Sequence, residues 1–235
     1  MSKIKAVILA GGLGTRLRPL TYLVPKPMLP LGDKPILERI IIDLRDQGIR
    51  DIVISCSYLA RIIEAYFGNG SWLGVDISYV KAPKPLGTAG QLKQAKDVIN
   101  ETFIAIYGDV YAKVDYRDLL TYHKSLKATA TMVLRRMKHN VRFGVIEIDN
   151  QSRVLEWREK PQLEFRVNAG IYVFEPRVFD YILDGVDSMD RVFKVMIERG
   201  ERVYGYEFTG EVYDIGDMAS YEEAVKKFTE ELGKI

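Results

Sequence analysis

The sequence predicts an α/β fold in which helices cover both faces of a mainly parallel central sheet. Short runs of β-branched and aliphatic residues alternate, four times in succession, with segments that have the apolar spacing of a helix. The expected strands are almost continuously apolar, as burial on both faces of a parallel sheet requires. With 235 residues, 47% of them hydrophobic, the chain can bury a sizeable core in a single domain.

The first part of the sequence carries the alternation of strands and helices. In the segment from Pro35 to Gly48, the proline suits a first helical turn, the glycine suits a helix end, and the apolar residues between them share one face. We expect strands at residues 4–10, 51–57, 75–80, 102–107 and 128–136, and helices at residues 35–48, 58–68, 88–99 and 115–126.

After about residue 136 the sequence becomes rich in strands. We expect strands at residues 143–149, 153–160, 166–175 and 202–208, a helix around residues 189–199 and a final helix capped by Asp217. No linker, repeat or low-complexity tract divides the chain. We therefore predict one domain, residues 1–235, with two functional halves, 1–135 and 136–235. The second half is expected to supply strands that wall one side of a cleft.

Composition limits the classes of partner. The formal net charge is only +2, so no global basic field favours nucleic acid or an anionic membrane surface. No run approaches the ~20 apolar residues of a membrane span. The single cysteine, Cys56, lies in an apolar run and is expected to fill the core. We expect a cytoplasmic protein with no nucleic-acid or membrane partner.

A glycine-rich loop, Ala10–Arg16, follows the first expected strand and is the first candidate site. Its glycines allow bare backbone to approach a ligand, so that main-chain N–H groups point at phosphate oxygens. Arg16 adds a forked donor, and Lys26, between two prolines, adds a point charge. The Gly-Lys-Ser/Thr of a Walker loop is absent, and Leu17 breaks a dinucleotide fingerprint. The alternative is a strand-to-helix turn with incidental charges.

A second glycine stretch, residues 84–92, also opens a helix after a strand. Gly87, Thr88 and Gly90 could bring a helix N-terminus close to a base or a phosphate. An ordinary helix cap at Thr88 is the alternative.

Acidic residues follow two other expected strands. Asp109 ends "FIAIYGD", and Asp214 lies in "EVYDIGD". Mg²⁺ commonly takes one or two protein carboxylates together with substrate phosphates, so these two residues are the candidate ligands. A turn residue is the alternative for Asp109. Asp217 is assigned to the helix cap, which leaves Asp214 as the better ligand.

The chemistry that this sequence suggests needs no strong general base. Only two histidines are present, His123 and His139, and neither lies near a glycine motif. A phosphate monoester that attacks a nucleotide fits, because its second pKa is about 6 and it is a dianion at neutral pH. Catalysis would then rest on positioning and charge neutralisation.

The motifs "LAGGLGTRLRPLT" and "PKPMLPLGDKPILE" together resemble the signature of the sugar-1-phosphate nucleotidyltransferases, also called NDP-sugar pyrophosphorylases. The resemblance continues in order through "PLGTAGQL", "YGDV", "FGVIEID", "EWREKP", "NAGIYVFEP" and "VYDIGDMASY", from about Ile8 to Tyr221. It implies a Rossmann-like three-layer sandwich with a small strand-rich sugar-binding half. The implied substrates are a nucleoside triphosphate (NTP) and a sugar 1-phosphate, with Mg²⁺ as cofactor.

The resemblance also implies roles for individual residues. Arg16 and Lys26 would neutralise the triphosphate, and Asp109 and Asp214 would hold Mg²⁺. Lys160 would grip the sugar phosphate, although strand ends on the surface are the alternative for Glu159 and Lys160. The residues implied to line the nucleotide are Leu9, Ala10, Gly11, Gly12, Gly14, Thr15, Gly87, Thr88 and Gly108, and those implied to hold sugar hydroxyls are Gly144, Glu159 and Asn168.

Within the family, "PLGTAG" is similar to the mannose-1-phosphate guanylyltransferase pattern, which favours GTP and mannose 1-phosphate. A glucose-1-phosphate thymidylyl- or uridylyltransferase is the alternative. A non-catalytic nucleotide-sugar-binding subunit is the alternative of another class, although Arg16, Lys26, Asp109, Asp214 and Lys160 are all present. We expect no C-terminal hexapeptide-repeat β-helix domain, and a homo-oligomer stays open.

Overall fold

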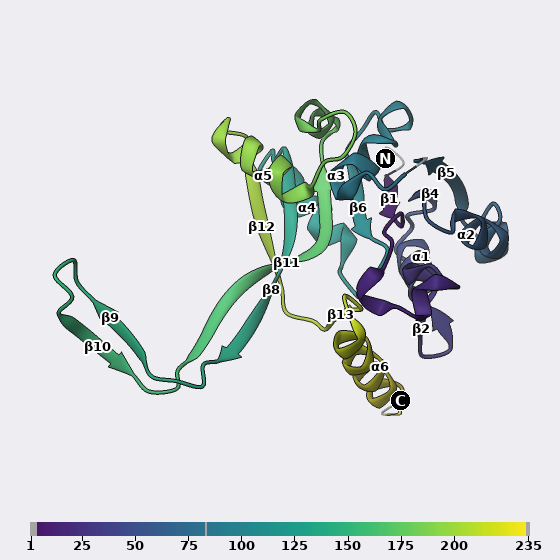
Figure 1. Ribbon diagram of the computed structural model, residues 1–235. Helices are drawn as coiled ribbons and strands as arrows, with labels where there is room; N and C mark the ends of the chain where they lie inside the picture. The colour runs from purple at the N-terminus through teal and green to yellow at the C-terminus, as the bar shows by residue number, and fades with distance from the viewer. Residues whose placement is uncertain (1–3, 83, 234–235) are drawn as a thin grey trace.

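A computed structural model describes residues 4–82 and 84–233, and its centre is a seven-stranded sheet in the order β12-β8-β11-β6-β1-β4-β5 (Figure 1). β1 runs parallel to β4 and β6, β4 to β5, and β8 to β12, whereas β11 is antiparallel to its neighbours β6 and β8. The predicted α/β fold with a mainly parallel sheet is confirmed. The sheet strands are β1 (Lys5–Leu9), β4 (Asp51–Cys56), β5 (Asp76–Lys81), β6 (Phe103–Tyr107), β8 (Ala130–Asn140), β11 (Gln162–Phe174) and β12 (Val203–Phe208).

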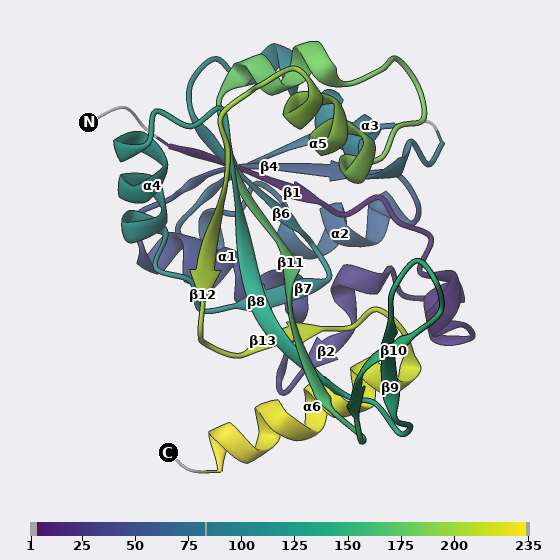
Figure 2. The ribbon, with the colours of Figure 1, turned by 90° about the vertical axis from the view of Figure 1, so that its left-hand side faces the viewer.

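Helices cover both faces of this sheet (Figure 2). Alternate residues of β1 divide between two cores, because Ala6 and Ile8 pack on one face while Val7 and Leu9 pack on the other. The helices of the first core are α1 (Ile36–Asp46), α2 (Ala60–Phe67), α4 (Tyr116–Ser125) and α6 (Met218–Leu232), and those of the second are α3 (Gly87–Lys93) and α5 (Met189–Glu198). The result is three layers.

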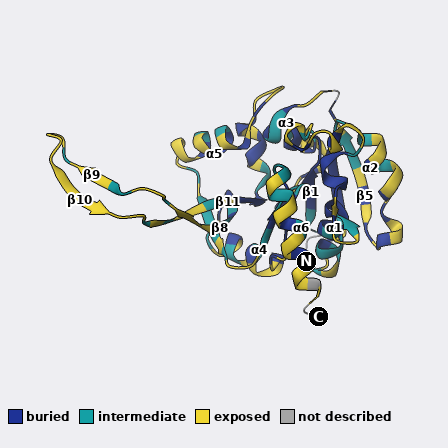
Figure 3. Ribbon diagram, turned by 60° about the horizontal axis from the view of Figure 1, so that its bottom comes forward, coloured by how far each residue is buried: buried dark blue, intermediate teal, exposed yellow. Residues whose placement is uncertain are grey.

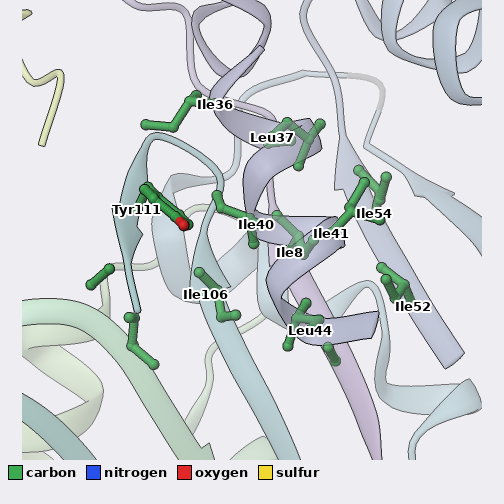
Figure 4. Close-up of a cluster of buried hydrophobic side chains, with 14 of the residues drawn as sticks. Ile8, Ile36, Leu37, Ile40, Ile41, Leu44, Ile52, Ile54, Ile106 and Tyr111 are labelled. Carbon is green, nitrogen blue, oxygen red and sulfur yellow. The ribbon is translucent and has the colours of Figure 1, made fainter. Parts of the chain in front are cut away.

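The apolar stripe of α1 illustrates how the layers are held together. Ile36, Leu37, Ile40, Ile41 and Leu44 form one face, and all are buried against side chains of β1, β4 and β6 (Figure 4). Removing this much apolar surface from water is the main stabilising contribution of the helix.

Two expectations differ from the structure. The helix expected at residues 88–99 ends at Lys93, because tight i to i−3 bonds follow it, from Gln94 N to Gln91 O and from Ala95 N to Leu92 O. Two short strands, β7 (Val110–Ala112) and β13 (Val212–Asp214), pair antiparallel outside the main sheet and were not expected. Another short pair, β2 (Pro30–Leu31) with β3 (Lys34–Pro35), precedes α1.

The strand-rich second part forms a long projection that we call the arm, residues 136–167. β8 and β11 stay paired beyond the point where β12 ends, and β9 (Val145–Ile148) and β10 (Val154–Arg158) form a hairpin at the tip. Figures 1 and 3 show the arm standing clear of the body, with its residues largely exposed. Among the described residues, no helix combines the length and the hydropathy that crossing a bilayer would require.

The α1 stripe can be tested by truncation. Ile41→Ala should lower the free energy of unfolding by about 2 to 5 kcal/mol, because it leaves a cavity in a fully buried site. Urea denaturation followed by circular dichroism measures the change. Ile197→Ala, at an exposed position of α5, should change it by no more than about 0.5 kcal/mol. Equal losses in the two variants would contradict the assigned packing.

Candidate active site

A cavity of about 420 Å³ opens where β1 and β6 end. This is the edge of an open parallel sheet where ligands usually bind. The cavity brings together nine of the residues expected at the site: Leu9, Ala10, Gly12, Arg16, Lys26, Thr88, Asp109, Asn168 and Asp214. Eight others do not line it: Gly11, Gly14, Thr15, Gly87, Gly108, Gly144, Glu159 and Lys160.

The glycine loop presents free main-chain donors beside the cavity. The N–H groups from Gly12 to Arg16 donate to no acceptor among the described residues. A side chain at Gly12 would meet nothing within 4 Å, so the loop is open there. Consecutive free N–H groups of this kind make a concave binding site for an anion.

The neighbouring glycines hold the loop in this shape. Gly11 N donates to Gln91 Oε1 at 2.8 Å, and a Cβ at Gly11 would lie 2.9 Å from the same oxygen. Gly14 has a φ of +59°, and its carbonyl accepts a hydrogen bond of 2.8 Å from Thr21 Oγ1. Gly108 N donates to Leu9 O at 2.9 Å where β1 and β6 end. These glycines therefore shape the cavity wall and the loop.

Lys26 and Asp109 form an ion pair at the base of the cavity. Lys26 is 8% exposed, and its Nζ donates to Asp109 Oδ2. A buried ammonium needs such a partner, because desolvation of an unpaired charge costs several kcal/mol, on the order of the effective penalty per buried ion. The pair leaves the cation next to the loop N–H groups, where a polyphosphate would lie.

Asp214 is brought to Asp109 by the pairing of β13 with β7. Asp214 lies opposite Val110 in this ladder, and Ile215 N donates to Asp109 O at 3.3 Å. Burial raises the pKa of Asp214 above its model value of 3.8, and the charge of Asp109 raises it further, while Lys26 and Arg135 oppose the shift. The two carboxylates therefore share one cavity and interact electrostatically.

This carboxylate pair fits the demands of Mg²⁺. No group of three or more His, Cys, Asp or Glu side chains suited to a metal occurs in residues 4–82 and 84–233. Mg²⁺ needs only one or two carboxylates when substrate phosphates and water complete its octahedron. A divalent cation between Asp109 and Asp214 would also favour their ionised forms, which burial disfavours. The residues present thus suit a metal that arrives with a phosphate ligand.

Two arginines border the acidic pair. A Cβ at Gly216 would lie 3.3 Å from Asp214 Oδ1 and 3.8 Å from Arg16 Nη2, so this glycine leaves open the space between carboxylate and guanidinium. Arg135, half-buried on β8, lines the cavity and forms no hydrogen bond or ion pair with another described residue. Its neighbour Arg136 pairs with Glu164 and Glu207 on the arm side.

Arg135 and Gln91 were not expected from the sequence. Two adjacent arginines in an apolar strand were a usable signal, since neighbouring residues of a strand face opposite sides. A second cavity, of about 600 Å³, shares Arg135, Val212, Asp214 and Ser220 with the first. The two cavities therefore meet at Arg135 and Asp214.

The prediction that Asp217 caps the last helix is confirmed. Its carboxylate accepts a hydrogen bond of 2.9 Å from Ser220 N. His123 is also accounted for, because it is buried between Thr131 Oγ1 at 2.8 Å and Glu175 Oε1 at 3.2 Å, away from the cavity. Burial lowers the pKa of this imidazole.

The second glycine stretch packs against the segment before α5. Ala89 N and Gly90 N donate to Asp187 O at 3.1 and 3.3 Å, and a Cβ at Gly87 would lie 2.3 Å from that oxygen. Thr88 does not cap its own helix, since its hydroxyl accepts from Met189 N at 2.9 Å, at the start of α5. This stretch joins α3 to α5, while Thr88 also lines the cavity.

The sugar-site candidates fall into two places. On the arm, a Cβ at Gly144 would lie 3.0 Å from the Trp157 ring, whose Nε1 donates to Glu159 Oε2 at 3.2 Å. Lys160 follows with Nζ at 3.9 Å from Glu159 Oε1. Asn168 instead lies at the cavity, where its Oδ1 accepts from Gly170 N at 2.9 Å. A sugar-binding role for these residues stays a prediction.

The contact between α3 and α5 depends on Asp187, whose carboxylate is 2% exposed and is paired with Arg191. Hydrogen bonding from Arg191 lowers the Asp187 pKa from 3.8 to about 2. Stabilisation from a depressed carboxylate pKa is complete above the unfolded value and is lost as the pH falls toward the folded value.

Asp187→Asn should therefore lower the free energy of unfolding at neutral pH by about 2 kcal/mol. The difference from wild type should shrink as the pH falls from about 4 toward about 2, which urea titrations at several pH values would show. Asp184→Asn removes an exposed pair with Lys93 and should cost no more than about 1 kcal/mol. A pH-independent effect of Asp187→Asn would refute the ionic role of the carboxylate.

The sequence matches the family model described as nucleotidyl transferase over residues 5–231. It is 34% identical to the UTP–glucose-1-phosphate uridylyltransferase of Synechocystis sp. over 95% of this chain and 63% of that protein. It is 39% identical to the mannose-1-phosphate guanylyltransferase of Mycobacterium tuberculosis over 87% of this chain and 58% of that protein. The chain thus spans about six tenths of the length of the first curated relatives that it matches.

One relative is similar over nearly its whole length. The D-glycero-alpha-D-manno-heptose 1-phosphate guanylyltransferase of Aneurinibacillus thermoaerophilus is 35% identical over 95% of this chain and 98% of that protein. Among solved structures, HddC from Yersinia pseudotuberculosis complexed with GMP-PN superposes with a TM-score of 0.75 at 28% identity. The match covers 96% of this chain and 99% of that one.

Proposed function

The chain belongs to the nucleotidyl transferase family, and on that premise we propose that it transfers a nucleotidyl group from an NTP to a sugar 1-phosphate. The products are an NDP-sugar and pyrophosphate. One observation carries the proposal: free loop N–H groups, Arg16, Lys26, Asp109 and Asp214 all meet at one cavity. Residues 1–135 mainly bind the nucleotide and residues 136–235 mainly bind the sugar.

The chemistry follows from these groups. An oxygen of the sugar phosphate attacks the α-phosphorus, a new P–O bond forms, and the bond to the bridging oxygen breaks as pyrophosphate leaves with the electron pair. The nucleophile is already a dianion near neutral pH, since its second pKa is about 6, so no side chain must remove a proton. The protein's task is to orient the two anions and to neutralise their charge.

The loop N–H groups and Arg16 bind the departing phosphates. Lys26 exchanges its contact with Asp109 for one with the triphosphate when the nucleotide enters. Asp109 and Asp214 hold Mg²⁺, which when bound polarises the phosphoryl oxygens and screens the repulsion between the substrates. Arg135, at the junction of the two cavities, lies where the sugar phosphate would approach Asp214.

We propose GTP as the donor and mannose 1-phosphate as the acceptor. In support, two of the relatives described above are named guanylyltransferases, and both printed acceptors have the manno configuration. The reciprocal coverage of the heptose relative favours a manno-heptose 1-phosphate as a second candidate acceptor. Glucose 1-phosphate with UTP or dTTP is the alternative, which the uridylyltransferase relative favours.

A substrate panel tests the reaction. Pyrophosphate release should be fastest with GTP and a manno-configured sugar 1-phosphate, by at least about tenfold over glucose 1-phosphate with any NTP, because polar contacts to the base and hydroxyls set specificity. Fastest release with UTP or dTTP and glucose 1-phosphate would establish the alternative. Calorimetric binding of NDP-sugars without any release would indicate a non-catalytic subunit.

The carboxylate pair can be tested separately. Asp109→Asn and Asp214→Asn should each lower kcat by at least about 100-fold, because each removes a metal ligand from the developing charge. Asp217→Asn, at a cavity residue whose carboxylate caps α6, should stay within about threefold, since asparagine also caps helices. Steady-state kinetics with matched circular dichroism spectra provide the measurement. Wild-type kinetics in Asp214→Asn would remove it from the metal site.

A further inference from the structure

The hairpin at the tip of the arm has one apolar face that nothing in the described chain covers. Val154 pairs with Ile148 and Trp157 with Ile146, so these side chains share a face, and they are between 39% and 67% exposed. A register shift between Val154 and Glu156 keeps them together despite the odd spacing. The opposite face carries the pair Glu147 and Glu156. A two-stranded hairpin is marginally stable alone, so this face needs a partner surface.

The stem of the arm fixes its direction. The β8–β11 ladder runs without a break from Asn140 and Gln162 to Leu134 and Asn168. At its root, Glu207 of β12 accepts hydrogen bonds from Arg136, at 2.7 Å, and from Arg166. The arm therefore continues the main sheet outward (Figures 1 and 3). Folding it onto the body of its own chain would break this ladder.

A second uncovered apolar patch lies beside the glycine loop. Leu20, Tyr22 and Leu23 are 39%, 56% and 80% exposed, and Leu13 within the loop is 39% exposed. Thr21 ties this segment to the loop through its hydrogen bond to Gly14 O, and Arg18 lies 4.9 Å above the Tyr22 ring. The chain thus exposes two apolar surfaces, one on the arm and one at the rim of the candidate active site.

The sugar-site candidates are divided in the same way. Gly144, Glu159 and Lys160 are collected around Trp157 on the arm, and none of them lines either cavity at the body. If these side chains serve the reaction of the proposed function, on which this step rests, an arm must be brought to a cavity. The arm of the same chain is held away by its stem.

We propose that two copies of this chain pair symmetrically, each placing its arm over the glycine-loop patch of the other. The apolar hairpin face, with Trp157, covers the Leu20–Leu23 segment of the second copy, and Glu159 and Lys160 complete that copy's sugar-phosphate site. An exchange of equivalent segments gives a closed two-fold assembly in which both patches are buried twice. Each active site then contains the loop and acids of one copy and the arm of the other.

The assembly is tested by light scattering after size exclusion. The wild type should be a dimer, and Trp157→Glu or Leu23→Glu should raise its dissociation constant by at least about 100-fold, because each places a charge in a buried apolar contact. Ile197→Glu, which adds a charge at an exposed position of α5, should leave the dimer intact. A monomeric wild type, or dimers unaffected by both interface variants, would overturn the proposal.

Mixing two inactive variants tests the shared site. Asp109→Asn disables the cavity and Lys160→Ala the arm, so each homodimer alone should be nearly inactive. After subunit exchange, half of the dimers should be mixed and one of their two sites intact, so about a quarter of wild-type activity should return. If each chain supplied its own arm, every site would carry a defect and no activity would return.

These measurements separate the two proposals. A wild type that is silent with every NTP and sugar 1-phosphate would reject the proposed function, whereas the oligomeric states of the arm and loop variants would still decide the arm exchange. Conversely, an active enzyme whose mixed variants stay inactive would retain the function and reject the shared site.

Discussion

The antiparallel pairing of β7 with β13 is the interaction on which the candidate active site depends. It places Asp109 and Asp214, which are distant in the sequence, at the wall of one cavity. Burial and the charge of Asp109 raise the pKa of Asp214, and Lys26 partly compensates for the two carboxylates. A cavity that holds two acids and a lysine is poised to exchange internal charge pairing for a metal and a polyphosphate.

The glycine loop complements this arrangement with donors rather than with charge. Gly11 and Gly14 are held by Gln91 and Thr21, so the loop keeps its shape without using the N–H groups from Gly12 to Arg16. An anion can occupy them without breaking an internal hydrogen bond, which lowers the cost of binding. Donors, basic side chains and acids thus lie on different elements but converge on one cavity.

Much of the fold could be predicted because burial on both faces of a parallel sheet forces long apolar runs, as in the strand before the glycine loop. The arm could not, because its extent depends on the long-range pairing of residues 134–140 with 162–168. Arg135 was missed because the sequence alone did not show which of two adjacent arginines faces the cavity.

The glycine stretch at Gly87 shows a different limit. Glycine is required both where backbone approaches a phosphate and where backbone approaches backbone, so the pattern cannot separate the two. At Gly87 the carbonyl of Asp187 occupies the space that a side chain would need. For Asp109 and Asp214, in contrast, acids that end strands were a sound indication, because strand ends on one edge of a sheet converge.

The most direct test of the central claim is calorimetric titration of a non-hydrolysable GTP analogue, with and without Mg²⁺, into the wild type and the Asp109→Asn, Asp214→Asn and double variants. If the two acids share a cation with the triphosphate, Mg²⁺ should strengthen binding to the wild type. Either substitution should remove most of that gain, and the double variant should lose little more. Equal Mg²⁺ dependence in all four proteins would contradict the account.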